Sequence, residues 1–275
     1  MYNYNMIITV DSKGEKTHHW LLEAVLGCSE SELEKCIDSR VPVISLVGGG
    51  GKTTCVKAMA SECRQKGIRA VVATTTHMQM PYDELLLDTE DMQALYDLME
   101  REGQVWLGRR LDPLYQDPDM VKNKSRSLGT EFVRRVCVGS GFPVFIEADG
   151  AKCLPCKVPA DHEPVIVPET THVLNVYGMD SLGKSFSESV FRPELACAMA
   201  GKSLFDPVSK EDILRMALDN QGGRKCVMPE MNYQVILNKA DTALQVEEAL
   251  DIARGMIAAG IPCVHVTSDL KSLMV

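Results

Sequence analysis

One stretch limits what this chain can fold into more than any other, and it is VISLVGGGGKTT at residues 43–54. An apolar run of strand length is followed by four glycines, a lysine and two threonines. Glycine permits positive φ angles and has no Cβ, so the backbone N–H groups of such a turn can converge on an anion. A helix that begins at the lysine would add the positive end of its dipole at the same place. The stretch therefore predicts a phosphate-binding loop between a strand and a helix.

The loop departs from the full pattern G-x-x-x-x-G-K-[ST], because Leu46 stands where the first glycine is required. What remains is G-x-x-G-K-T-T, and its alternative explanation is a flexible turn with an incidental lysine. The strand before it and the helix after it favour a nucleotide site. We expect Lys52 to reach the β- and γ-phosphates and the Thr53 hydroxyl to ligate Mg²⁺. The residues expected to contact the nucleotide here are Gly48, Gly49, Gly50, Gly51, Lys52, Thr53 and Thr54.

Beyond this loop, apolar runs of strand length alternate with helical stripes such as Val56, Met59, Ala60 and Cys63. Such alternation indicates a mainly parallel sheet. We predict an α/β fold, a three-layer P-loop NTPase with a mainly parallel sheet and helices on both faces, over residues 41–275. The predicted strands are 69–74, 104–107, 143–146, 172–176, 233–237 and 262–266, and residues 108–123 are predicted to be a loop.

Residues 1–40 carry no recognisable chemistry and are predicted to be an N-terminal helical appendage. Residues 20–26 suggest one short helix, and Ser31 followed by Glu34 suggests the cap of a second one. The first ten residues have neither a basic start nor a long apolar run, so we expect no secretory signal and no membrane span. We therefore expect a cytoplasmic protein whose ten cysteines are mostly reduced core residues.

The net charge of −9 and the pI of about 5.2 argue against a nucleic-acid partner. The sequence also has no basic stripe, so a nucleic-acid-binding surface is not expected.

Polar residues follow the predicted strands, where ligands of parallel sheets bind. Thr74-Thr75-Thr76-His77 could complete the Mg²⁺ shell or contact the γ-phosphate, although threonine is also common in strands. We include Thr75 and Thr76 among the nucleotide contacts, and His77 is a candidate base or helix cap. These are expectations from position alone.

The strand at 143–146 is followed by Glu147-Ala148-Asp149-Gly150. In a P-loop protein an acidic residue at this place holds the Mg²⁺ shell, and a glycine three residues later donates its N–H to the γ-phosphate. Glu147 and Gly150 have this spacing, and Asp149 is a second possible ligand or water activator. The alternative is an acidic turn without a ligand.

The strand at 233–237 is followed by Asn238-Lys239-Ala240-Asp241, an N-K-x-D pattern. The Asp241 carboxylate can accept two hydrogen bonds from guanine N1–H and the exocyclic amine, which adenine cannot offer. Lys239 can cover the purine face, Asn238 can brace the loop, and a backbone N–H near Ser268 can meet the base carbonyl. The alternative is a helix N-terminus capped by Asp241.

Two other features stay open at this level. Cys153 and Cys156 form a single C-x-x-C pair, which supplies two of the four ligands of structural zinc and could have a redox or transient metal role. Arg192 could clamp a phosphate or act as an arginine finger in cis, or it could lie in a surface turn.

Taken together, the segments 46–54, 74–77, 147–152, 159–164 and 238–241 resemble one family, the YqeC family, described as accessory proteins of selenium-dependent hydroxylases. The resemblance implies a bacterial cytoplasmic P-loop protein tied to the maturation of a selenium-dependent molybdenum hydroxylase, with that pathway supplying a client protein. The E-x-x-G and N-K-x-D pair is similar to that of metallochaperone-type GTPases. The pair Cys153/Cys156 is not part of the family pattern.

We therefore predict a Mg²⁺-dependent nucleoside triphosphatase, with GTP favoured over ATP, acting as an accessory factor for another enzyme. Lys52 and Glu147 are expected to act at the reaction centre, with Asp149 and His77 as candidates for activating water. The alternatives are an ATP-dependent kinase or ligase on a small acceptor, since G-x-x-G-K-T-T also occurs in amide ligases, or a nucleotide-binding scaffold without hydrolysis.

Overall fold

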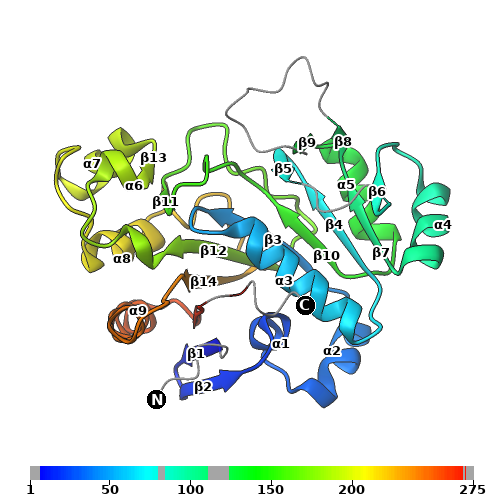
Figure 1. Cartoon of the computed structure of the whole chain (residues 1–275), viewed down its shortest axis with the longest axis horizontal. Helices are drawn as coiled ribbons and strands as arrows, with labels where there is room; N and C mark the ends of the chain where they lie inside the picture. The colour runs from blue at the N-terminus through cyan, green and yellow to red at the C-terminus, as the bar shows by residue number, and fades with distance from the viewer. Residues whose placement is uncertain (1–6, 80–83, 111–123, 269, 271–275) are drawn as a thin grey trace.

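The structure is a computed structural model that describes residues 7–79, 84–110, 124–268 and 270. Its main element is a ten-stranded sheet in the order β2-β1-β15-β14-β12-β3-β10-β4-β7-β6 (Figure 1). Neighbouring strands are parallel from β15 to β6, and β1 and β2 are antiparallel at one edge. The predicted α/β class with a mainly parallel sheet is therefore confirmed. The strands are β1 (Ile7–Asp11), β2 (Gly14–His18), β3 (Val43–Gly48), β4 (Ala70–Thr74), β6 (Leu86–Leu87), β7 (Gln104–Leu107), β10 (Val144–Glu147), β12 (His172–Gly178), β14 (Asn232–Asn238) and β15 (Cys263–Val266).

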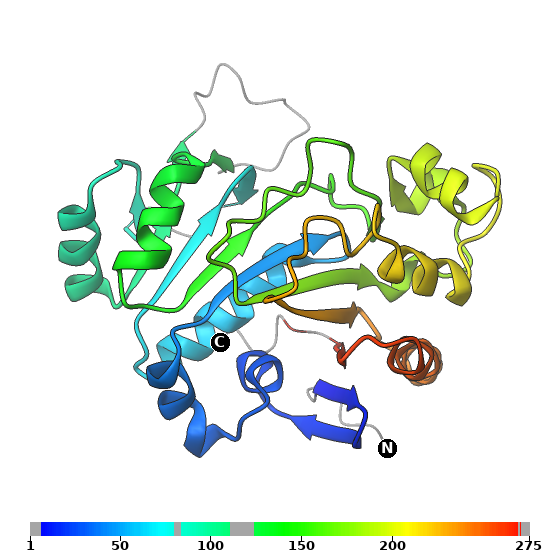
Figure 2. The same ribbon diagram turned by 180° about the vertical axis from the view of Figure 1, so that it is seen from behind.

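Helices cover both faces of this sheet (Figure 2). Along β4 the buried side chains alternate, because Ala70 and Val72 pack into the core that holds α1 to α3, and Val71 and Ala73 into the core that holds α4 and α5. Such alternation is expected for a parallel strand buried on both sides. The helices are α1 (Leu21–Leu26), α2 (Leu33–Ser39), α3 (Lys52–Gln65), α4 (Met92–Glu102), α5 (Thr130–Gly139), α6 (Phe186–Ser189), α7 (Pro193–Ala200), α8 (Lys210–Leu218) and α9 (Ala243–Ala258).

The helix after the glycine turn, α3, forms where we predicted it. Val56, Met59, Ala60 and Cys63 are all buried in the core beneath the sheet. Because β3 ends at Gly48 and α3 begins at Lys52, the lysine lies at the carboxyl edge of the parallel sheet, next to the ends of β10 and β12.

The N-terminal segment differs from our expectation of a purely helical appendage. The helix at 21–26 is present, but β1 pairs with β15 and thereby extends the main sheet, with β2 beside it. The second helix is preceded by a capping box formed by Ser29 and Glu32 rather than by Ser31 and Glu34. The strands escaped notice because β2 is almost entirely exposed and has no apolar alternation. The domain boundary near residue 40 stays a prediction.

Shorter elements lie at the carboxyl edge of the main sheet. β5 (His77–Gln79), β9 (Lys124–Arg126) and β8 (Arg109–Arg110) form a small antiparallel sheet, and β11 (Cys156–Lys157) pairs with β13 (Val190–Phe191). The predicted loop at 108–123 thus contains a short strand at Arg109–Arg110, and residues 111–123 lie outside the described part. A short helix, α7, begins at Pro193, and Ser209 with Asp212 forms the capping box of α8.

Within the described residues, no helix is both long enough and apolar enough to cross a bilayer.

Candidate functional site

The glycine turn is packed so tightly against neighbouring strand ends that larger residues do not fit. A Cβ on Gly50 would lie 2.2 Å from the backbone nitrogen of Gly178, and one on Gly49 would lie 2.7 Å from the carbonyl oxygen of Leu154. Gly50 and Gly51 also have positive φ angles of 65° and 115°. The turn is therefore a fixed structural part of the sheet edge.

Three of the predicted phosphate-binding amides are already used within the protein. The N–H of Gly48 donates to Asp149 Oδ2 at 3.1 Å, that of Gly49 to the Val176 carbonyl at 2.9 Å, and that of Gly50 to the Leu154 carbonyl at 3.0 Å. The expectation that Gly48, Gly49 and Gly50 offer their amides to a phosphate therefore does not hold in this conformation.

The amides of α3 remain as the anion donors. For the N–H groups of Lys52, Thr53 and Thr54 we find no acceptor within the described part of the chain. The first amides of any helix lack intrahelical partners, and the helix dipole favours a negative charge beside them. The predicted anion site is thereby narrowed to the first turn of α3.

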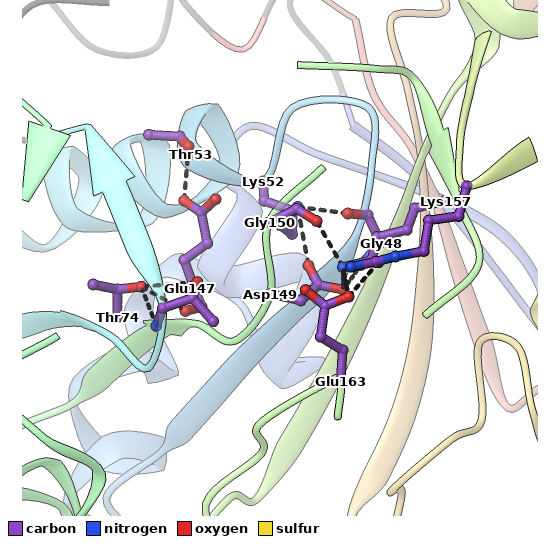
Figure 3. Close-up of polar contacts among 11 residues, drawn as sticks. Gly48, Lys52, Thr53, Thr74, Glu147, Asp149, Gly150, Lys157 and Glu163 are labelled. Carbon is purple, nitrogen blue, oxygen red and sulfur yellow. Dashed lines mark hydrogen bonds and ion pairs between the residues drawn. The ribbon is translucent and has the colours of Figure 1, made fainter. Parts of the chain in front are cut away.

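Lys52 is almost completely buried at this position (Figure 3). Its ammonium donates to the Gly48 carbonyl and lies 3.1 Å from Asp149 Oδ1. Burial alone would lower the pKa of Lys52, but the negative charges of Asp149 and Glu147 outweigh burial and raise the pKa above its usual value. Lys52 is thus a permanent positive charge.

Glu147 and Thr53 come together from different elements, as predicted for a metal shell. Glu147 ends β10, between β3 and β4, and its Oε2 accepts a hydrogen bond from Thr53 Oγ1 at 2.7 Å (Figure 3). A hydroxyl and a carboxylate are oxygen ligands of the kind Mg²⁺ prefers. The side-chain oxygens of Thr53 and Glu147 are therefore chemically suited to hold Mg²⁺.

The threonines after β4 have structural partners. Thr74 Oγ1 donates to the Glu147 carbonyl at 2.9 Å and accepts from the Thr76 amide at 3.0 Å. Thr75 Oγ1 donates to the Val165 carbonyl at 2.9 Å. His77 is exposed and lies on β5, where its backbone pairs with Arg126. Roles for Thr75, Thr76 and His77 toward a nucleotide stay predictions.

A row of buried charges leads away from Lys52, and sequence analysis did not foresee it. Lys157 Nζ lies 3.1 Å from Asp149 Oδ2 and 2.7 Å from Glu163 Oε2, and it donates to the Gly150 carbonyl at 2.6 Å (Figure 3). Glu163 also pairs with Arg192. Burial on its own would raise the pKa of Glu163, but Lys157 and Arg192 outweigh burial and lower it. We call the row Lys52–Asp149–Lys157–Glu163–Arg192 the ion-pair chain.

The N-K-x-D segment lies against the glycine turn. Asn238 is buried, its Nδ2 donates to the Gly50 carbonyl at 2.8 Å, and its Oδ1 accepts from Thr267 Oγ1 at 2.9 Å. The prediction that Asn238 braces the loop is therefore confirmed. Ser268 follows directly after Thr267 and is half-buried.

Lys239 and Asp241 have different surroundings. Lys239 has a positive φ of 62°, and its ammonium pairs with Asp180 Oδ2 at 2.9 Å, a partner that no sequence pattern indicated. Asp241 is exposed. The N-cap of α9 is Thr242 with Gln245 as the reciprocal partner, so the alternative in which Asp241 caps this helix is wrong.

The two cysteines of the C-x-x-C pair have different surroundings. Cys156 is buried, its thiol donates to Ser181 Oγ at 3.2 Å, and burial raises its pKa to about 12. Cys153 is exposed, and both thiols are free. A protonated, buried thiol is a poor nucleophile and a poor metal ligand, so Cys156 is better explained as a core residue than as a redox or metal-binding residue.

Comparison with known proteins decides the family. A family model described as "YqeC protein" matches residues 44–194, more than half of the chain. The chain belongs to the YqeC family. A YqeC relative from Escherichia coli (strain K12), named "Uncharacterized protein YqeC", is 25% identical over 223 residues, which cover 75% of this chain and 79% of the relative. The segment matched to YqeC contains the glycine turn, Glu147 and the whole ion-pair chain, and it ends before Asn238.

Proposed function

We propose that this YqeC protein binds a nucleoside triphosphate with Mg²⁺ at the first turn of α3 and hydrolyses it, with GTP as the favoured nucleotide. We further propose that it acts as an accessory factor in the maturation of a selenium-dependent molybdenum hydroxylase. The observation that carries the nucleotide proposal is the 2.7 Å contact between Thr53 and Glu147, beside Lys52 and the open amides of α3.

The triphosphate would be held by the amides of residues 52–54 and by the Lys52 ammonium. In the observed conformation Asp149 is the partner of Lys52. A phosphate would replace this carboxylate as the partner of the ammonium, so that the buried charge stays compensated throughout.

Thr53 and Glu147 would hold the metal together with phosphate oxygens and water. Among the described residues there is no group of three or more His, Cys, Asp or Glu side chains placed to hold a metal ion, so this chain offers no dedicated metal cage. That is the usual situation of Mg²⁺, which keeps several waters and binds one or two protein groups plus phosphate. The ion would supply charge neutralisation on the phosphates.

Of the two candidates for activating water, Asp149 is the better placed. It lies beside Lys52, whereas His77 is exposed on β5. A phosphate that takes over Lys52 would leave Asp149 Oδ1 without its cation, and this oxygen could then accept a hydrogen bond from the attacking water. For the base we assign Lys239, Asp241 and Ser268 the roles that the N-K-x-D pattern implies.

The test is a titration of the purified protein with GTP, XTP and ATP in the presence of Mg²⁺. Lys52→Ala should weaken binding of every nucleotide by about a hundredfold, since a charge-assisted contact in a buried site is lost. Asp241→Asn should shift preference from GTP to XTP, again by about a hundredfold, because the asparagine cannot accept both guanine donors. Glu247→Gln is the matched control, because Glu247 is exposed on α9 near the same loop.

The same titration separates the alternatives. If Asp241→Asn left the affinities for GTP, XTP and ATP unchanged, recognition of guanine by Asp241 would be contradicted. Nucleotide binding without release of phosphate would support the alternative of a nucleotide-binding scaffold that does not hydrolyse. Hydrolysis without any acceptor, lost in Lys52→Ala, is the outcome we expect.

One observation favours a second candidate, an ATP-dependent kinase or ligase with an anionic acceptor. The ion-pair chain extends from Lys52 through Asp149 to Lys157 and Arg192, two further cations that could hold an anionic acceptor. For this candidate, turnover would depend on the acceptor and would follow ATP rather than GTP.

A further inference from the structure

Three cations gather around one aromatic ring close to the glycine turn. The Nζ atoms of Lys152 and Lys157 each lie 5.6 Å from the centre of the Phe191 ring, and the Arg192 guanidinium carbon lies 4.5 Å from it. Every other aromatic ring in the described part of the chain that has such a contact has one cation. We call these four residues the Phe191 cluster.

The cluster is built from three separate places in the chain. Lys157 and Phe191 are direct neighbours in the pairing of β11 with β13, Arg192 follows Phe191, and Lys152 lies in the turn after β10. Lys152 and Arg192 have positive φ angles of 46° and 62°. A left-handed backbone at a residue other than glycine costs about 1 kcal/mol or more and persists where the surrounding structure imposes it. The cations are thus held in place rather than gathered by chance at a flexible surface.

Positive charge is in excess at the outer end of the cluster. Glu163 pairs with Lys157 and Arg192, and Asp149 is shared between Lys157 and Lys52. Lys152 is exposed and has no carboxylate within ion-pair distance among the described residues. The first turn of α7 adds its dipole next to Arg192, although the exposed Glu194 in that turn offsets part of it.

We propose that the Phe191 cluster binds the anionic group of a second substrate, a carboxylate or a phosphate, between Lys152 and Arg192. Arg192 would offer its planar fork and Lys152 its exposed ammonium, while the Phe191 ring covers the apolar part of the ligand. This inference rests on the second candidate above, the kinase or ligase with an anionic acceptor, because hydrolysis alone needs no second substrate. The ion-pair chain connects Arg192 to Lys52 through Glu163, Lys157 and Asp149, so the anion would lie at the other end of this chain from Lys52.

The test is isothermal titration of the full chain with two probes, citrate for the carboxylate and pyrophosphate for the phosphate, with and without saturating Mg²⁺-nucleotide. Lys152→Ala should weaken binding of at least one probe about fivefold, as expected for a partly exposed charge-assisted contact. Lys184→Ala, which removes another exposed lysine, should leave both affinities unchanged. Arg192→Lys keeps the charge and loses the fork, which matches carboxylate and phosphate alike, so it should weaken binding of whichever probe the cluster takes.

The result also identifies the source of the anion. With the first turn of α3 occupied by nucleotide, binding of citrate alone supports a carboxylate ligand, binding of pyrophosphate alone supports a phosphate ligand, and binding of both supports a general anion site. No binding of either probe in the millimolar range, or equal effects of Lys152→Ala and Lys184→Ala, overturns the inference. A nucleotide titration on the same preparation reports on the proposed function independently, so one proposal can fail while the other stands.

Discussion

The groups of charged side chains at the two ends of α3 differ in net charge. At its N-terminal end the ion-pair chain contains three cations, Lys52, Lys157 and Arg192, and two carboxylates. At its C-terminal end the single cation Lys66 lies among Glu23, Glu30 and Glu62. With Glu147 as a third carboxylate, the side-chain charges at the first end balance, and the open backbone amides of α3 supply the positive potential that an anion site requires. The second end has a surplus of carboxylates.

The carboxylates at the second end join elements of the fold. Glu62 Oε2 accepts the Leu22 amide at 2.8 Å and so caps α1, whose own N-cap residue, Trp20, makes no side-chain cap. The other oxygen of Glu62 is buried without a hydrogen-bond partner. Burial raises the pKa of Glu62 to about 8. The comparison teaches that the charges at the N-terminal end of α3 pair with one another beside amides open to a ligand. At the C-terminal end, the contact between Glu62 and α1 is structural and depends on the protonation of Glu62.

The largest loss of stability should come from a substitution in the middle of the ion-pair chain. Lys157→Met keeps the length of the side chain and leaves Asp149 and Glu163 buried beside each other with one cation fewer. Removing one partner of a buried ion pair costs about 3–5 kcal/mol of unfolding free energy. Urea unfolding measures this loss. Lys152→Ala is the control, and an equal, small effect of both variants would show that Lys157 is not structurally required.

The second cluster should respond to pH. The pKa of Glu62 is raised in the folded state, so its stabilising contribution is complete below the unfolded pKa near 4.5 and is lost as pH rises toward about 8. Each pKa unit corresponds to about 1.4 kcal/mol, so stability should fall by about 2 kcal/mol between pH 5.5 and 7.5 from this group.

Glu62→Gln keeps an acceptor for Leu22 and cannot ionise, so urea unfolding of this variant should show a flatter pH dependence than the parent protein. Glu34→Gln, a change of an exposed glutamate on α2, is the control. An unchanged slope in Glu62→Gln would show that another group causes the pH dependence.

The smallest effect concerns the competition between Asp149 and phosphate for Lys52. Asp149→Asn keeps the size and removes the negative charge that now pairs with Lys52. Nucleotide affinity should rise about fivefold, equivalent to about 1 kcal/mol, whereas turnover should fall if Asp149 orients the water. Fluorescence titration and phosphate release measure the two quantities on one preparation. A drop in affinity would instead mean that Asp149 supports the bound nucleotide directly.

Sequence analysis located the main parts of the candidate site because these parts depend on local signals. A glycine run between a strand and a helix, an acid after a buried strand and the N-K-x-D tetrapeptide are each contained in a few residues. In a parallel sheet the carboxyl ends of strands share one edge, so Glu147 and Asn238 could be expected to lie near Lys52. Both do, through Thr53 and Gly50.

The partners that decide how the site works come from distant segments and have no local signal. Lys157 and Asp180 belong to no pattern of their own, and nothing in GGGG indicates that the amides of Gly48, Gly49 and Gly50 face Asp149, Val176 and Leu154. The edge strand β2 escaped for a similar reason, since its exposed side chains lack apolar alternation, and the buried strand β1 beside it is only five residues long.

The sequence by itself determined the main parallel strands from β3 to β15, the place where α3 begins and the identity of the residues at the strand ends. It could do so because hydrophobic period and glycine geometry act over short distances. Only the tertiary structure decided which of those groups are already occupied and which remain open. Burial makes every polar or charged group depend on its neighbours in space. Those neighbours are 101 residues apart in the contact between Gly48 and Asp149 and 188 residues apart in the contact between Gly50 and Asn238.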